Sequence, residues 1–257
     1  MNTIVHQTLS RKRTDHFLGS FEIVPCQDYQ RGRPYQQTRL VACAQLRSDD
    51  KFCDRLKSYR NWNGHWYNER HVEEWVARTP AWLFPNQAVH VLASQNYAHL
   101  GEKIDLLLLD DRNQFHVVEV KAERVASNRG VTPDEIEGQM SRYVEFLRLQ
   151  LPPFPVSLAN YYDQFSAQFF GSSRSLVTDL QDIFGHSPRP VADSSVVLWR
   201  TFLTEGYDES AVDFFVNSHL NGRGPIRLIY YQFNPCLTTK RHCIEFWEVH
   251  MPSQVRE

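Results

Sequence analysis

Residues 103–121 read KIDLLLLDDRNQFHVVEVK, two apolar runs joined by a polar turn at residues 110–113. Runs of this length predict two β-strands that pair as an antiparallel hairpin. Asp105 interrupts the first run, whereas Glu119 and Lys121 lie two residues apart in the second and therefore point to the same face. Pairing through the turn allows a register that brings Asp105 beside Glu119 and Lys121.

Two carboxylates and one ammonium group among apolar neighbours are typical of a metal site. Magnesium takes oxygen ligands, usually keeps several waters, and often binds only one or two carboxylates together with a substrate phosphate. Asp105 and Glu119 meet that requirement, and the backbone carbonyl of Val120 is a further oxygen beside them. A bound metal lowers the pKa of a coordinated water, which Lys121 would orient. The pattern predicts Mg²⁺- or Mn²⁺-dependent phosphodiester hydrolysis.

The rest of the chain alternates predicted helices and strands. Thr132 and Glu135 have capping-box spacing and Pro133 takes the first helical position, so a helix begins at Thr132 and runs to about Gln150. The other predicted helices cover residues 69–82 and 209–220, and the other strands cover residues 17–24, 38–46, 88–95, 194–203, 226–233 and 242–249. This order predicts an α/β fold with a mixed central sheet flanked by helices.

Four of these elements, in this order, resemble the PD-D/EXK nuclease superfamily. The segment GEKIDLLLLD followed by HVVEVKAE resembles the IDLL(x)nEhK pattern, with Ile104 in place of the proline. Gln139 and Tyr143 reproduce the QxxxY helix of RecB-type nucleases, and ERHVEEWVARTPAWL is similar to their first helix. The likeness is closest to the group that contains the archaeal and actinobacterial mismatch endonuclease. It covers roughly residues 69–249 and implies a restriction-endonuclease-like fold.

The resemblance also implies roles for residues outside the hairpin. The first helix of such nucleases offers an acid, for which Glu73 is the preferred candidate and Glu69, one turn earlier on the same face, the alternative. Gln139 is expected to orient the site lysine or the substrate, and Tyr143 to touch a backbone phosphate. Tyr143 could equally belong to the core.

The balance of charge gives no independent support for a nucleic-acid partner, because the formal net charge is −2. A nuclease needs basic groups only along the path of the phosphates, and Arg124 and Arg142 are the first candidates by their nearness in sequence to the site. Further candidates in predicted loops are Arg129, Arg223, Lys240 and Arg241. DNA, duplex or single-stranded, is the expected partner, and a homodimer is an expected assembly.

Domain boundaries follow where the resemblance begins and is interrupted. Residues 1–60 are expected to form a β-rich N-terminal element of unknown role, and residues 61–257 the nuclease domain, with an insertion at about 152–192. The five cysteines form no CxxC pair, and the chain has no long apolar run, so a soluble protein of the reducing cytoplasm is expected. Free buried cysteines are favoured over a metal or iron–sulfur site at Cys236, His242 and Cys243.

Two other functions fit the same residues. A non-catalytic nucleic-acid-binding or assembly module would retain the fold without chemistry, and Glu119 with Lys121 would then be an exposed ion pair on a sheet. An RNA-cleaving enzyme would use the same metal chemistry. The apolar residues on both sides of Asp105 and Glu119 predict burial, which favours the metal-dependent nuclease over the binding module.

Overall fold

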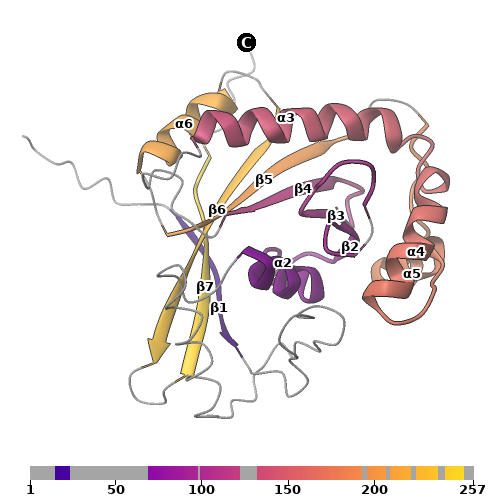
Figure 1. Ribbon diagram of the computed structural model, residues 1–257, viewed down its shortest axis with the longest axis horizontal. Coiled ribbons are helices and arrows are strands. Elements are labelled where there is room, and N and C mark those ends of the chain that lie inside the picture. The colour runs from indigo at the N-terminus through magenta and orange to yellow at the C-terminus, as the bar shows by residue number, and fades with distance from the viewer. Residues whose placement is uncertain are drawn as a thin grey trace, which may run out of the picture.

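The computed structural model of the chain describes residues 15–23, 69–97, 99–121, 132–192, 196–206, 209–220, 224–236 and 241–251. Within them the centre of the molecule is one mixed sheet with the strand order β1-β7-β6-β5-β4-β3-β2 (Figure 1). Its strands are β1 (His16–Ile23), β2 (Val89–Ser94), β3 (Leu106–Asp110), β4 (Phe115–Lys121), β5 (Leu198–Glu205), β6 (Ile226–Cys236) and β7 (Arg241–Glu248). The predicted mixed α/β architecture is confirmed.

Strands β2, β3 and β4 form an antiparallel meander, as the hairpin pattern predicts. The turn between β3 and β4 closes on Asp110, whose carboxylate accepts the backbone N–H groups of Arg112 and Gln114, and Asn113 takes the left-handed conformation with φ 63°. Every residue of β3 is buried, so both faces of this strand are covered. Strand β5 runs parallel to β4, and the connection between them must therefore cross over the sheet.

Helices cover both faces of the sheet (Figure 1). On one side lie α2 (Glu69–Arg78) and the short 3₁₀ helix η1 (Pro80–Trp82); on the other lie α3 (Pro133–Gln150) and α6 (Glu209–Leu220). The capping box of Thr132 and Glu135 is present at the start of α3. The predicted inward stripe is confirmed as well, since the buried residues of α3 include Ile136, Met140, Tyr143 and Leu147.

The segment predicted as an insertion, residues 152–192, packs on the edge of the sheet. It contains η2 (Val156–Leu158), α4 (Ala159–Phe169) and α5 (Leu176–Phe184), and both α-helices contact β2. Tyr162 of α4 is fully buried, and its hydroxyl lies 2.6 Å from His90 Nε2 of β2 and 2.6 Å from Asp179 Oδ2 of α5. The segment therefore covers the edge strand β2, which blocks pairing with another chain.

The N-terminal segment also belongs to the sheet in its described part. Strand β1 pairs antiparallel with β7, from His16 opposite Glu248 to Ile23 opposite His242. Residues 16–23 of the predicted β-rich N-terminal element are thus an edge strand of the common sheet. The second strand predicted there, residues 38–46, lies outside the described residues.

In the described part of the chain, no helix has both the length and the apolar character to span a membrane.

Candidate active site

The register of β3 and β4 brings the predicted acids together. Leu106 pairs with Val118 and Leu107 with Val117, so the residue before β3, Asp105, continues the register opposite Glu119. Both carboxylates are buried, with exposed fractions of 5% for Asp105 and 2% for Glu119. Burial of two acids side by side distinguishes this site from an exposed ion pair on a sheet surface.

Each oxygen of these two carboxylates has a different environment. Asp105 Oδ2 accepts a hydrogen bond from the backbone N–H of Val120 at 2.8 Å, and its Oδ1 accepts one from the side-chain amide of Gln95. Lys121 Nζ donates to Glu119 Oε1 at 2.5 Å. Glu119 Oε2 is buried and has no N–H or hydroxyl donor among the described residues, and the Asp105 carboxyl lies within hydrogen-bonding reach of the Glu119 carboxyl. A buried carboxylate oxygen without a donor is costly, and a cation would stabilise it.

The two acids of α2 approach the pair from the neighbouring layer. Glu73 is buried and accepts hydrogen bonds from Gln95 Nε2 at 3.4 Å and from Asn96 Nδ2 at 2.5 Å. Glu69 is partly exposed, and its Oε1 lies 3.9 Å from Lys121 Nζ. Gln95 donates to both Glu73 and Asp105 and so links them, whereas Glu69 contacts the lysine.

Three buried carboxyl groups, those of Asp105, Glu119 and Glu73, share the site with one ammonium group, that of Lys121. Burial raises the pKa of Asp105 well above its usual range, and the charges of Glu119 and Glu73 add to this effect. Burial likewise raises the pKa of Glu119. Burial alone would lower the pKa of Lys121, but the charges of Glu119 and Glu69 raise it to about 12, so this amine stays protonated at neutral pH. A divalent cation would take the place of the protons that the raised pKa values favour and would let both acids ionise.

The oxygen ligands at this site fit magnesium, which needs few ligands from the protein, better than a metal whose ligands are all side chains. In the part of the chain that the structure describes, no group of three or more His, Cys, Asp or Glu side chains could hold a metal ion by itself. Asp105 and Glu119 supply two carboxylates, and magnesium commonly takes one or two with waters and substrate oxygens completing the shell. The buried Glu119 Oε2 without a partner and the clustering of three buried acids are the structural observations that agree with this assignment.

Glu73 makes the stability of the metal-free protein dependent on pH. Burial raises its pKa from 4.5 to about 7, so the folded state binds its proton more tightly than the unfolded state does. The stability that this group contributes is fully present below about pH 4.5 and is lost as the pH rises through 7. Glu73→Gln is expected to raise the free energy of unfolding at pH 8 by up to about 3 kcal/mol, with little effect at pH 4.5. Urea denaturation in EDTA at both pH values checks this; an equal effect at the two would contradict it.

The QxxxY residues lie next to the site but contact each other. Tyr143 is buried and its hydroxyl donates to the backbone carbonyl of Lys103 at 2.8 Å, two residues before Asp105. Gln139 Nε2 donates to the Tyr143 hydroxyl at 2.5 Å, and in the described part of the chain no hydrogen bond joins Gln139 to Lys121. In the described contacts the pair supports the backbone that leads into Asp105, which agrees with the core alternative for Tyr143.

The basic candidates are only partly placed. Arg142 is exposed on α3, one residue before Tyr143. Arg124, Arg129, Arg223 and Lys240 lie outside the described residues, as do the side chains of Arg241, Cys236, His242 and Cys243. Val120 meets the site through its N–H group, and the role of its carbonyl as a metal ligand stays a prediction.

Gln95 and Asn96 are site residues that the sequence pattern did not reveal. Both lie in the turn after β2, where polar residues are ordinary and therefore carry no signal of function. Their amides reach Glu73, and Gln95 also donates its backbone N–H to the carbonyl of Asp105 at 3.3 Å. The sequence signal that could have found them is their position at the end of a predicted strand, residues 88–95, that precedes the strand of Asp105.

Comparison with known proteins identifies no relative. No protein-family model matches the chain, and neither a curated protein nor a solved structure matches it. The motifs and the geometry of Asp105, Glu119 and Lys121 are therefore the evidence for its function.

Proposed function

We propose that the chain is a magnesium- or manganese-dependent nuclease that hydrolyses phosphodiester bonds of DNA, with endonucleolytic cleavage as the favoured mode. The observation that carries the proposal is the burial of Asp105 opposite Glu119. One Glu119 oxygen accepts a hydrogen bond from Lys121, and the other has no N–H or hydroxyl donor in the described residues. Asp105 and Glu119 would hold the metal, and Glu73 would assist through the amide of Gln95.

The order of the elements supports the resemblance to PD-D/EXK nucleases. Helix α2 with Glu73 comes first, Asp105 precedes β3, Glu119 and Lys121 end β4, and α3 carries Gln139 with Tyr143. All four elements meet at the same end of the β3–β4 pair. Such an arrangement would suit a restriction-endonuclease-like active site.

Each residue would have a separate part in hydrolysis. When bound, a divalent cation lowers the pKa of a coordinated water and neutralises charge on the phosphate. Lys121 stays protonated at neutral pH, so it would donate hydrogen bonds to the attacking water or to the phosphoryl oxygen rather than act as a base. Asp105 is fixed by the Val120 N–H and by Gln95, which preserves the orientation of its carboxylate.

Cleavage assays test the proposal directly. Purified protein is incubated with supercoiled plasmid, linear duplex, single-stranded DNA and single-stranded RNA, each with Mg²⁺, Mn²⁺ or EDTA. Metal-dependent cutting of DNA that is lost in Glu119→Gln supports the proposal, and preferential cutting of RNA would reassign the substrate. No cutting of any polymer, together with metal-independent DNA binding, would favour the non-catalytic module.

Metal binding should stabilise the fold. Mg²⁺ at about 100 times its Kd is expected to add about 2.7 kcal/mol to the free energy of unfolding, because only the folded chain brings Asp105 and Glu119 together. Thermal unfolding with and without Mg²⁺ measures this. Asp105→Asn should lose the increase, whereas Asp134→Asn, which neutralises an exposed acid on α3, should keep it. An equal increase in the two variants would contradict binding at the proposed site.

Gln95 is expected to tune the affinity for the metal. Gln95→Leu removes the amide that joins Asp105 to Glu73 and should weaken metal affinity by about 10- to 100-fold, the usual effect of losing a group that orients a ligand. Titrating cleavage rate against Mg²⁺ should shift the midpoint more than the plateau. Gln181→Leu, an exposed substitution on α5, is the control. A fall in plateau with no shift in midpoint would argue against this role.

A further inference from the structure

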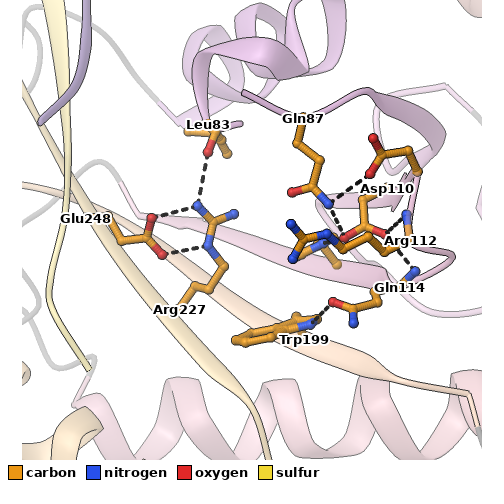
Figure 2. Close-up of polar contacts among 10 residues, drawn as sticks. Leu83, Gln87, Asp110, Arg112, Gln114, Trp199, Arg227 and Glu248 are labelled. Carbon is orange, nitrogen blue, oxygen red and sulfur yellow. Dashed lines mark hydrogen bonds and ion pairs between the residues drawn. The ribbon is translucent and has the colours of Figure 1, made fainter. Parts of the chain in front are cut away.

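A pocket with polar lining residues lies at the other end of the β3–β4 pair from the candidate active site. It is lined by the loop after η1, by the β3–β4 turn and by residues of β1, β4, β5, β6 and β7, and its volume is about 300 Å³. Asp110, at the end of β3, belongs to this pocket, whereas Asp105 precedes the start of the same strand. Five residues of strand separate the two by roughly 17 Å. Figure 2 shows the polar contacts around the pocket.

Aromatic rings form much of its wall. The ring of Phe84 meets His116 edge-on with a centroid distance of 4.6 Å, and His116 lies nearly parallel to Trp199 at 6.1 Å. The guanidinium of Arg227 lies 4.3 Å from the centroid of Phe84. Flat apolar surfaces of this kind favour a planar ring as ligand.

The amide side chains that line the pocket are held in fixed orientations (Figure 2). Gln87 Nε2 donates to Asp110 Oδ2 at 2.8 Å, which leaves its amide oxygen as an acceptor. Trp199 Nε1 donates to Gln114 Oε1 at 2.8 Å, which leaves the Gln114 amide hydrogens as donors. The lining thus offers both kinds of hydrogen-bonding group without reorganisation.

Charges in the pocket lining balance, because two acids, Asp110 and Glu248, stand with two arginines, Arg112 and Arg227. Arg227 donates to Glu248 through Nε at 2.8 Å and Nη2 at 2.9 Å, and Nη2 also donates to the carbonyl of Leu83 (Figure 2). Asp110 accepts four hydrogen bonds, from Gln87, His116 and the two backbone N–H groups of its turn. Burial would raise the pKa of Asp110, but these hydrogen bonds lower it below the ordinary value. An uncharged ligand therefore suits the pocket better than an ion.

Polar atoms without partners gather on the same face of the sheet. His116 Nδ1, Thr201 Oγ1 and Arg227 Nη1 are buried and lack a hydrogen-bond partner among the described residues. Thr201 of β5 pairs with Arg227 of β6 on one side and with Val118 of β4 on the other. Val118 lies two residues from His116 on the same strand. His116 is only 3% exposed, and its Nε2 lies 3.2 Å from the acceptor Asp110 Oδ2, so Nε2 carries the proton and Nδ1 is an acceptor.

We propose that this pocket binds a planar, uncharged ring with hydrogen-bond donors and acceptors on its edge, the chemistry of a nucleobase. His116 Nδ1 would accept from the ring and Arg227 Nη1 would donate to it, while the half-buried Trp199 contacts its face. The volume suits one or two rings, because it lies at the lower end of the range for small-ligand sites, about 300–1,000 Å³. The inference does not depend on the nuclease activity.

Calorimetry with the full chain tests it. Adenosine, guanosine, cytidine and uridine are titrated to about 10 mM, well above a Kd in the millimolar range. Ribose, which lacks the ring, and benzoate, which adds a charge, are the negative controls. His116→Phe keeps an aromatic ring and removes Nδ1, and Gln114→Leu is a milder change at a partly exposed position. Lys121→Ala alters the candidate active site and leaves the pocket intact.

The proposal is supported by saturable binding of at least one nucleoside. That binding should weaken about tenfold or more in His116→Phe or Gln114→Leu and stay unchanged in Lys121→Ala. If a short single-stranded DNA displaces that nucleoside, the base is supplied by a strand; if it does not, the ligand is a free nucleoside. Absence of binding for all four nucleosides overturns the proposal, and so does binding that both pocket variants retain in full. Either result leaves the proposed nuclease function untouched, because that function is read from cleavage.

Discussion

Lys121→Ala is expected to slow DNA cleavage by about 10²- to 10³-fold at saturating Mg²⁺. The ammonium group lies 2.5 Å from Glu119 Oε1 and has a pKa of about 12, so the variant loses a permanent positive charge beside the metal ligands. Loss of one preorganised donor to a transition state typically has an effect of this size. Single-turnover cleavage of plasmid DNA measures it.

The control for Lys121→Ala is the removal of a positive charge far from the candidate site in sequence. Arg148→Ala removes an exposed positive charge from α3 and should leave the rate unchanged. Circular dichroism and thermal unfolding establish that Lys121→Ala is folded. Full activity in all three of Lys121→Ala, Glu119→Gln and Asp105→Asn would rule out this site as the catalytic centre.

The sequence predicts this centre because its signals are local. Glu119 and Lys121 are two residues apart, and a strand fixes their common side. The short polar turn at residues 110–113 limits the register to a few possibilities, one of which places Asp105 opposite Glu119. The helix that begins after Thr132 is equally local, since capping depends on residues three positions apart.

Features that depend on distant contacts were not predictable in the same way. Strand β1 pairs with β7, more than 200 residues later, and no pattern within residues 16–23 specifies that partner. The packing of α4 and α5 on β2 depends on Tyr162 meeting His90, and neither residue is distinctive in sequence. Gln139 contacts Tyr143 because both side chains project from one face of α3, a geometry compatible with several partners.

Arg200→Met is expected to destabilise the fold by about 3–5 kcal/mol, the usual range when one partner of a buried ion pair is removed. Arg200 of β5 donates through Nη1 to Glu137 Oε1 of α3, with Ser141 Oγ at 3.3 Å. The side chains of Arg200 and Glu137 are only 3% and 5% exposed. The variant would leave the Glu137 carboxylate facing an apolar side chain in the interior.

Urea denaturation of Arg200→Met and of the double variant Arg200→Met/Glu137→Leu separates charge from packing. The double variant should regain most of the lost stability, because replacing both charges with apolar groups removes the cost of desolvation. Equal losses in the two proteins would show that shape, rather than charge, holds α3 on β5. Helix α3 also carries Tyr143, whose hydroxyl supports the Lys103 carbonyl beside Asp105. If the double variant restores stability and keeps the metal-dependent increase in unfolding temperature, packing alone is sufficient to position the candidate site.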